Sequence, residues 1–493
     1  MHIMPLLLKD GYKIDHRRQY PEGTRYVYSN LTPRASRRGA DKNGVIFFGL
    51  QYFVKEYLQT RFNRDFFEHP LDEVMAVYKR RIDNYLGPNA ITFEHIAELH
   101  QLGYLPIRIK ALPEGSFVPN NVPVLTIVNT DPRFFWLTNM LETIMSSVIW
   151  KMSTTATTAF LYRRNFQRAA IETGGDLSFV PWQGHDFSFR GMCGSEDAMA
   201  CGAGHLLSFT GSDTIPAIDF LEYYYGANSD LELIAGSVAA TEHSTMCMGQ
   251  EDNEEATYRR LLTEIYPTGI VSVVSDTWDF WKVITETLPN LKDVIMARDG
   301  KLVIRPDSSP KTPVEIICGD PDAPAGSPEN KGLIRCLWDT FEGVTNEKGY
   351  RVLDPHIGCI YGDSITIERQ EQILSRLTEM GFASTNVVLG IGSYTYQMVT
   401  RDTDGWAMKA TWGETEADGA IEIYKDPKTD SGTKKSHRGL LAVYQNAEKS
   451  YYVKQQVSRQ EENRGALELV FADGALVRDQ TLSEIRAIVA ERI

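Results

Sequence analysis

Residues 271–276 read VSVVSD, a short run of small and β-branched residues that ends in an aspartate. Segments of helical length separate most runs of this kind, which is the rhythm of parallel βα units. The repeats predict an α/β fold with an irregular (β/α) barrel, in which every strand delivers its C-terminal residue to one shared face. The other runs, each apolar with a polar or glycine tip, are LVIRPDS (302–308), HIGCIYGD (356–363), VVLGIGS (387–393), FSFRG (187–191), FTGSD (209–213) and ATEHS (240–244).

The chemistry of these tips suits a charged, hydroxyl-rich ligand such as a phosphorylated sugar. Asp307 and Asp363 could accept hydrogen bonds from ribose hydroxyls or hold a hydrated Mg²⁺. Arg190 and Arg305 could bind phosphate oxygens in bidentate fashion, and the glycines of LGIGS (389–393) would let backbone N–H groups approach a phosphate closely. The competing interpretation is that each aspartate only caps the helix that follows it. That interpretation explains one tip more easily than the whole set.

The chain has 493 residues, which is too long for one ordinary domain. Two helices are expected before the barrel, at about 133–150 and 155–173. Near the C-terminus, Asp473-Gly474 predicts a hairpin turn, and Thr481 with Glu484 has the spacing of a helix-capping box. The predicted parts are an N-terminal α+β part (1–130), a helical connection (131–179), the barrel with the active site (180–400), and C-terminal strands and a helix (401–493) that complete one sheet domain with the N-terminal part.

The composition narrows the class of partner. Lys and Arg number 51 against 65 Asp and Glu, a net charge of −14, which argues against nucleic acid or an anionic membrane as the main partner. The six cysteines are scattered and include no CxxC pair, so no disulfide framework is expected. The N-terminal residues lack the features of a signal peptide, and polar residues interrupt the most apolar helical stretch, 134–152. We expect a cytoplasmic protein that binds small molecules.

Other chemistries lack the motifs that they require. The sequence contains no GxxxxGK[ST] for a Walker-type ATP site, no HxH strand for a metal-dependent hydrolase, and no GxSxG elbow. His243 in ATEHS is ambiguous, because a single histidine is usually a structural hydrogen-bonding residue or a general acid/base. Alternatively, Glu242 could hold one ring nitrogen and leave the other nucleophilic. Phe187 could stack on a flat heteroaromatic ring or belong to the core.

The order of the motifs along the chain matches that of a known family. They are DGYK (10–13), HRRQYP (16–21), FFGLQY (47–52), LPIRIKALPEG (105–115), NTDP (129–132), WLTNMLET (136–143), HDFSFRG (185–191), GSDT (211–214), AATEHS (239–244), VSVVSD, IRPDS (304–308), GD (362–363), TRD (400–402) and YKDP (424–427). This ordered set, which spans nearly the whole chain, resembles the nicotinate/nicotinamide phosphoribosyltransferase family, above all its nicotinamide-using members. The resemblance implies the type II phosphoribosyltransferase fold. It also implies transfer of a phosphoribosyl group from phosphoribosyl pyrophosphate to nicotinamide, with Mg²⁺, in NAD salvage.

The resemblance also assigns roles around the pyridine ring. Phe187 would pack on one face of the ring and Tyr12, from the second subunit of a homodimer, on the other. Asp213 would hydrogen-bond the carboxamide and so favour the amide over the acid. His243 would be the histidine that ATP phosphorylates, which couples ATP hydrolysis to better substrate binding. With Asp213 and His243, Asp307 is the third residue expected to act in catalysis.

The remaining implied ligands hold the sugar, the phosphates and the metal. Arg190 and Arg305 would bind pyrophosphate and phosphate. Mg²⁺ would be held mainly by the substrate phosphates, with Asp276, Asp307 and Asp363 as candidate protein ligands. The further substrate-binding residues are Pro306, Asp307, Gly362 and Asp363 near the ribosyl group, Gly392 and Ser393 at the 5′-phosphate, and Arg34, Arg401 and Lys409, of which Arg401 would come from the partner subunit.

Two departures from the family pattern and two alternatives remain open. The phosphate loop reads GIGS where the family has a longer glycine run, and Ala407 stands where a hydroxyl residue is usual beside Lys409. Lys434 is the best match to a basic residue of the ATP site. The first alternative is a nicotinate phosphoribosyltransferase, which Asp213 disfavours because a carboxylate there would repel nicotinate. The second is a non-catalytic binding protein on the same scaffold.

Overall fold

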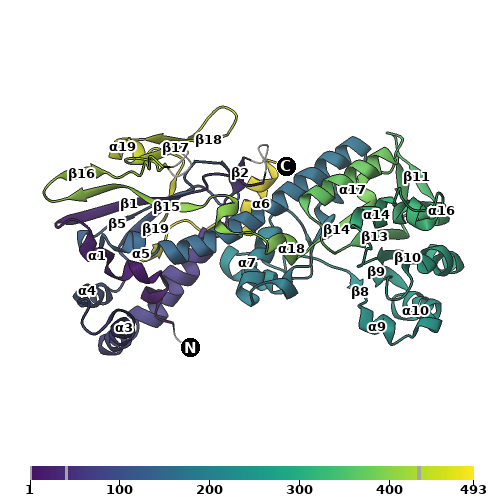
Figure 1. The fold of residues 1–493 in the computed structure, drawn as a ribbon, viewed down its shortest axis with the longest axis horizontal. Helices are drawn as coiled ribbons and strands as arrows, with labels where there is room; N and C mark the ends of the chain where they lie inside the picture. The colour runs from purple at the N-terminus through teal and green to yellow at the C-terminus, as the bar shows by residue number, and fades with distance from the viewer. Residues whose placement is uncertain (1–2, 39–42, 430–434) are drawn as a thin grey trace. The chain divides into compact units, whose positions relative to one another are not determined.

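The computed structural model describes residues 3–38, 43–429 and 435–493, which form two compact units. The sheet unit comprises Met1–Thr157, Leu221–Ala227 and Val399–Arg492. The barrel unit comprises Thr158–Phe220 and Asn228–Met398. The two ends of the chain thus belong to the same unit, and the chain between them builds the other (Figure 1).

The sheet unit is built on one seven-stranded antiparallel sheet that draws strands from both ends of the chain. Figure 1 shows the N-terminal strand β1 beside the late strand β15, and β1 pairs with β15 from Thr24↔Thr415 to Thr32↔Ala407. The shared sheet domain predicted from the sequence is therefore confirmed. In spatial order the strands are β16 (Gly419–Glu422), β15 (Ala407–Thr415), β1 (Thr24–Thr32), β5 (Leu125–Asn129), β3 (Ile107–Ala111), β19 (Glu468–Ala472) and β20 (Ala475–Leu476).

Short hairpins and helices complete this unit. Asp473 and Gly474, both at positive φ, form the predicted turn between β19 and β20, and Thr481 with Glu484 forms the predicted capping box. The other elements are the pairs β2 (Gly44–Ile46) with β4 (Phe117–Pro119) and β17 (Leu441–Gln445) with β18 (Tyr451–Gln455), and the helices α1 (His16–Gln19), α2 (Leu50–Tyr52) with its π-type continuation to Phe67, α3 (Leu71–Leu86), α4 (Glu94–Leu102), α5 (Leu137–Met140), α19 (Arg459–Glu462) and α20 (Leu482–Ala490).

The barrel unit contains a curled, all-parallel sheet of seven strands. Most residues of its central strands are buried, and partly exposed ones such as Val303 and Val388 line a cavity. In spatial order the strands are β7 (Gly211–Ser212), β6 (Gly184–Asp186), β14 (Val387–Ile391), β13 (Ile357–Tyr361), β10 (Asp299–Arg305), β9 (Thr268–Val274) and β8 (Ala239–Ala240).

One segment joins the two edges of this sheet. Ala239 and Ala240 pair with β9, and three residues earlier Gly236 forms an isolated parallel bridge with Gly211 of β7. The Ser212 N–H donates to the Gly236 carbonyl, and the Gly236 N–H donates to the Thr210 carbonyl. The sheet therefore closes into a ring through a single short seam.

Helices follow the strands of the ring. In α17 (Ile367–Glu379) the buried residues Ile367, Gln370, Ile373, Leu374 and Leu377 recur at helical spacing, and Thr366 caps the first turn. Other elements are α7 (Ser195–His205), α9 (His243–Cys247), α10 (Glu254–Arg260), α11 (Phe280–Lys282), α12 (Leu288–Asn290), α13 (Lys292–Met296), α14 (Pro313–Cys318), α15 (Pro328–Lys331), α16 (Leu333–Phe341), α18 (Ser393–Tyr396), the hairpin β11 (Gly343–Thr345) with β12 (Arg351–Leu353), and α8 (Pro216–Tyr225), which crosses the boundary between the units.

Two expectations about local structure were wrong. A single helix, α6 (Glu142–Thr173), replaces the two helices expected at about 133–150 and 155–173. In its Ser/Thr-rich middle, the hydroxyls of Thr155 and Thr157 donate to the carbonyls of Lys151 and Ser153, one turn earlier, so these side chains are satisfied within the helix. The run FSFRG is not a strand, because β6 ends at Asp186 and Phe189–Gly191 forms a 3₁₀ turn.

No helix in the described ranges of the chain combines the length and the apolar character that a membrane crossing requires.

Candidate active site

The strand ends of the barrel unit bring several predicted ligands into contact. Gly362 follows β13 and Phe187 follows β6, and a methyl group placed on Gly362 would lie 3.1 Å from the Phe187 ring and 3.5 Å from the Asp307 carboxylate. Gly390 in β14 is closer still, since a methyl group there would lie 2.3 Å from the same ring. The Phe187 ring therefore packs directly on two strands that lack side chains at this level.

Asp213, just past β7, is held by two neighbours. Its Oδ1 lies 2.8 Å from His185 Nε2 and accepts a hydrogen bond of 2.9 Å from the Ser237 hydroxyl. Partial burial by itself would raise the pKa of Asp213, but the His185 hydrogen bond and charge, the Ser237 hydroxyl and Arg305 together lower it. The side chain remains 49% exposed. Asp213 therefore offers an ionised, oriented acceptor to a ligand.

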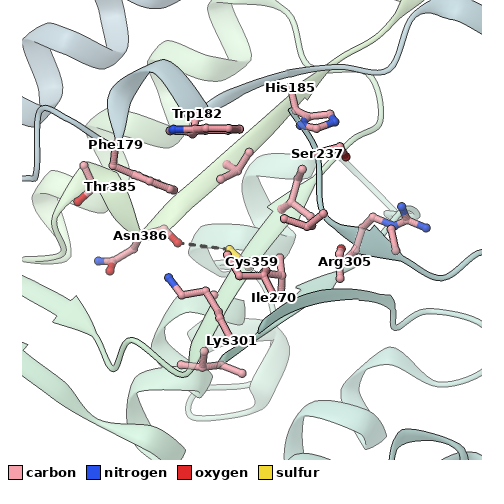
Figure 2. Close-up of a pocket in the computed structure, with 18 of the residues that line it drawn as sticks. Phe179, Trp182, His185, Ser237, Ile270, Lys301, Arg305, Cys359, Thr385 and Asn386 are labelled. Carbon is pink, nitrogen blue, oxygen red and sulfur yellow. Dashed lines mark hydrogen bonds between the residues drawn. The ribbon is translucent and has the colours of Figure 1, made fainter. Parts of the chain in front are cut away.

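The Asp213 carboxylate and the Phe187 ring line two adjoining cavities. One, of about 420 Å³, is lined mainly by apolar strand residues and falls in the usual size range of small-molecule sites. Figure 2 shows His185, Ser237 and Arg305 on one side of this cavity and Phe179, Trp182, Thr385 and Asn386 on the other. The second cavity, of about 650 Å³, is more open and is lined by Phe187, Phe189, Arg190, Ser212, Asp213, Thr214, Ile215 and Ser237.

Sequence reasoning missed two of these residues. The His185 ring contacts the Phe187 ring in a tilted arrangement, with centroids 4.6 Å apart and planes 43° apart, and the HDF motif could have indicated His185 as a strand-end residue beside Asp186. Ser237 follows the seam at Gly236, where no periodic pattern marks a strand. Its contact with Asp213 joins positions 24 residues apart, so only the folded chain reveals it.

An acidic group lies at the neighbouring strand ends. Asp276 Oδ2 accepts hydrogen bonds from the Asp307 N–H (3.1 Å) and the Ser308 hydroxyl (2.5 Å). Burial raises the pKa of Asp307, and Asp276 and Asp363 act in the same direction, whereas Arg305 and His243 oppose them. These side chains thus share one electrostatic environment. No group of three or more His, Cys, Asp or Glu side chains has the arrangement of a metal site within the described ranges.

His243 begins α9 and is half-exposed, with 49% of its side chain accessible. Its Nε2 lies 3.3 Å from Asp276 Oδ1. Glu242, the partner suggested by the sequence, instead accepts a hydrogen bond from the Ser244 hydroxyl. The idea that a carboxylate holds one ring nitrogen stands, but the residue named for it was wrong, because the side chain of Glu242 is engaged within its own turn.

The cationic residues of the barrel unit differ in exposure. Arg305 donates through Nη2 to the Thr241 carbonyl, and its buried Nε has no hydrogen-bond partner among the described residues. Pro306, next in sequence, is buried. Arg190 is exposed on the 3₁₀ turn and lines the larger cavity.

The phosphate turn lies against the same 3₁₀ turn. A methyl group on Gly191 would lie 2.0 Å from the Ser393 hydroxyl, whereas one on Gly392 would meet nothing within 4 Å. The space beside Gly392 is therefore open.

The other predicted ligands lie in the sheet unit. Tyr12 is 66% exposed. Burial lowers the pKa of Lys409, the Glu142 carboxylate opposes that shift, and Arg34, Lys425 and Arg401 add to it, so Lys409 belongs to a mainly cationic group of four basic residues with Glu142 nearby. Ala407 pairs with Thr32 across β15 and β1. Lys434 lies outside the described residues.

A buried ion pair supports this cationic group. Arg38 donates from Nε and Nη2 to the two carboxylate oxygens of Asp404, at 3.1 and 3.3 Å, and Asp404 is fully buried. The backbones of the two segments also pair, with the Ala35 N–H donating to the Asp404 carbonyl and the Arg37 N–H to the Thr403 carbonyl. The ion pair and the backbone hydrogen bonds therefore hold the segment that carries Arg34 against the segment that carries Arg401.

Comparisons with known proteins agree with the fold and show the family of the chain. The sequence model of the Nicotinate phosphoribosyltransferase (NAPRTase) family matches residues 182–464, and that of the Nicotinamide phosphoribosyltransferase, N-terminal domain, matches residues 5–109. The chain belongs to the nicotinate/nicotinamide phosphoribosyltransferase family.

Individual relatives match the chain over most or all of its length. The nicotinamide phosphoribosyltransferase of Acinetobacter baylyi is 52% identical over 503 residues, which cover 100% of this chain and 98% of the relative. That of Mycoplasma pneumoniae is 34% identical, over 90% of this chain and 98% of its own length. In fold, the chain is similar to the crystal structure of a nicotinate-nucleotide pyrophosphorylase from Pyrococcus furiosus, with a TM-score of 0.58, 14% identity, and 98% of this chain and 94% of that chain covered.

Proposed function

We propose that this protein is a nicotinamide phosphoribosyltransferase, which makes nicotinamide mononucleotide and pyrophosphate from nicotinamide and phosphoribosyl pyrophosphate in NAD salvage. The observation that carries the proposal is the ionised Asp213, held by His185 and Ser237 beside the Phe187 ring. A carboxylate accepts hydrogen bonds from the N–H₂ of a carboxamide but repels the carboxylate of nicotinate. Family membership and the 52% identity to the Acinetobacter baylyi enzyme support the same reaction.

The reaction needs positioning and charge stabilisation more than a protein nucleophile. The pyridine nitrogen displaces pyrophosphate at the anomeric carbon, so positive charge develops on the sugar while negative charge builds on the leaving group. Phe187 would orient the ring for attack. Arg190 and Arg305 would stabilise the departing pyrophosphate, and Asp307 and Asp363 would orient the ribosyl hydroxyls with Pro306 and Gly362 beside them. Gly392 and Ser393 would receive the 5′-phosphate.

Mg²⁺ is part of the proposal, and the charges of the site fit it. Asp276, Asp307 and Asp363 gather negative charge, and together with burial their repulsion keeps the pKa of Asp307 raised. Mg²⁺ would be held mainly by the substrate phosphates, with Asp276, Asp307 or Asp363 as candidate additional protein ligands. The ion would neutralise charge on the pyrophosphate.

ATP is proposed as a coupled co-substrate through His243. Its Nε2 faces Asp276, which leaves the other ring nitrogen available to attack a phosphoryl group. The γ-phosphoryl group of ATP would pass to the imidazole as ADP leaves, and water would later hydrolyse the phosphohistidine. The half-exposed side chain is accessible enough for that step.

We also propose a cytoplasmic homodimer with shared active sites. Tyr12 of the partner subunit would cover the second face of the pyridine ring, Arg401 would reach the 5′-phosphate from the partner subunit, and Arg34 and Lys409 would contribute further contacts to the substrate. The exposed Tyr12 ring and the cationic group around Lys409 support this assignment, since both present ligand-binding chemistry on the sheet unit. Nucleic acid and membranes are not proposed as partners, given the net charge of −14.

The deciding experiment is product analysis with phosphoribosyl pyrophosphate, Mg²⁺ and either nicotinamide or nicotinate, with and without ATP. Nicotinamide mononucleotide is the expected product. A preference for nicotinate would favour the acid-using alternative, and the absence of either mononucleotide would favour the non-catalytic one. Asp213→Asn should reduce the preference for nicotinamide over nicotinate, because the charge that repels nicotinate is removed. An unchanged ratio of the rates with nicotinamide and nicotinate would contradict the role of Asp213.

A further inference from the structure

A buried imidazole lies beneath the site and contacts two of its parts. His205, the last residue of α7, is fully buried. Its Nε2 lies 3.0 Å from the Gly211 carbonyl oxygen, and its Nδ1 lies 2.7 Å from the Tyr396 hydroxyl. Since a carbonyl can only accept, Nε2 carries the proton, and Nδ1 accepts from Tyr396.

Both partners belong to segments that hold proposed substrate ligands. Gly211 begins β7, two residues before Asp213. Tyr396 ends α18, which begins at Ser393 in the phosphate turn. The imidazole therefore joins the strand that presents the carboxamide acceptor to the turn that receives the 5′-phosphate.

The surroundings keep this connection in one protonation state. Burial lowers the pKa of His205 to about 4; the Asp186 carboxylate acts in the opposite direction, and His185 in the same one. Burial also holds the pKa of Tyr396 well above its ordinary value, so its hydroxyl stays protonated. The imidazole also stacks on Phe209, with centroids 5.0 Å apart and planes 22° apart, which fixes its orientation.

We propose that His205 and Tyr396 are positioning residues, whose hydrogen bond sets the separation between Asp213 and the phosphate turn and thereby aligns nicotinamide with the sugar phosphate. The proposal builds on the proposed function and adds to it two residues that touch no substrate. The turn has a second attachment, the Thr395 hydroxyl donating to the Ile365 carbonyl at 2.7 Å, so loss of the Tyr396 bond should displace the turn without releasing it.

The test is steady-state kinetics of Tyr396→Phe, which keeps the ring and removes the hydroxyl. The variant leaves the buried Nδ1 of His205 without its donor, so the phosphate turn should shift relative to Asp213. Both KM values, for nicotinamide and for phosphoribosyl pyrophosphate, should then rise up to about tenfold. A purely structural loss would lower the active fraction, and hence kcat, with both KM values unchanged. That result, or wild-type kinetics in the folded variant, would overturn the proposal.

Matched variants complete the experiment. Tyr225→Phe removes another buried tyrosine hydroxyl, which bonds Glu114 in the sheet unit, and should leave both KM values unchanged. His205→Gln keeps a donor and an acceptor and should remain within a few-fold of wild type, whereas His205→Asn is too short for both bonds and should raise both KM values. If Tyr396→Phe does not fold, the comparison of His205→Gln with His205→Asn tests the proposal instead. Equal KM values for these two variants would overturn it. A wild-type enzyme that makes no mononucleotide would instead refute the proposed function.

Discussion

Substituting Gly390 by alanine tests whether the Phe187 ring needs the bare strand beneath it. The added methyl carbon would lie 2.3 and 2.6 Å from two ring carbons of Phe187 and 2.7 Å from the Gly362 Cα atom. Real Cβ atoms do not approach other atoms so closely. The Phe187 ring, at the far end of its side chain, yields more easily than the Gly362 backbone just past β13, so the ring should move most. Gly390→Ala should therefore displace Phe187 from the place where it would meet the pyridine ring.

The size of the effect follows from what the ring contributes. Aromatic pairs in good geometry gain about 0.5–1.5 kcal/mol beyond area burial, so a misplaced ring should raise the KM for nicotinamide roughly 2- to 12-fold. Crowding a packed interior should lower the free energy of unfolding by about 1–3 kcal/mol. The KM for phosphoribosyl pyrophosphate should rise less, through the displaced Gly362, because Arg190, Arg305 and Ser393 are not among the atoms that the new methyl group would meet most closely.

The assay is initial-rate kinetics with each substrate varied in turn, together with urea unfolding. Gly358→Ala is the matched control, since it adds a methyl group to the neighbouring strand β13, where the nearest atom lies 3.4 Å away, an ordinary contact. It should change the nicotinamide KM little. If Gly390→Ala folds and binds nicotinamide as tightly as the control, Phe187 does not hold the ring and the reasoning fails.

The remaining predictions concern charge. Asp404→Ala should lower the free energy of unfolding by about 3–5 kcal/mol, because it leaves the Arg38 guanidinium buried without its carboxylate; a loss below about 1 kcal/mol in urea unfolding would contradict the pairing. Asp307→Asn should stabilise the ligand-free protein at pH 7 while reducing activity. The pKa of Asp307 is raised above its ordinary 3.8, so its ionisation costs stability above that value, and in melting curves the gain should shrink as the pH falls toward 3.8. His243→Ala should abolish any ATP-dependent decrease in the nicotinamide KM, and an ATP effect that survives would remove His243 from that role.

The long strands of the barrel and their tips could be predicted from the sequence. β9, β10, β13 and β14 each have five to seven residues, enough for a run of apolar, β-branched residues to be recognised. β6, β7 and β8 have only two or three residues and are defined by backbone hydrogen bonds to the adjacent strands. They are too short for a periodic pattern in the sequence to predict them. The alternating aromatic and polar residues of FSFRG predict a strand, but β6 ends one residue before it.

The site shows the same division between local and tertiary information. Asp213, Asp307 and Asp363 could be identified because strand-end acids in a barrel converge. The partners that tune them could not, since the contacts of Asp213 with Ser237 and of His243 with Asp276 join residues 24 and 33 positions apart. The Ser/Thr-rich middle of α6 resembled a break in composition, but in the folded chain its threonine hydroxyls bond carbonyls of the same helix, so the helix continues.

The seam at Gly236 gives the barrel a place to open. Its backbone bonds to Thr210 and Ser212 form an isolated bridge, while β9 and β10 share a ladder of seven paired positions. Local unfolding should therefore begin there, and the amides of Gly236 and Ser212 should exchange with deuterated water sooner than those of β9. Asp213 and Ser237 are the next residues on either side. A carboxamide that binds both Asp213 and Ser237 should hold the two sides of the seam together. Substrate binding should therefore slow amide exchange at Gly236 and Ser212.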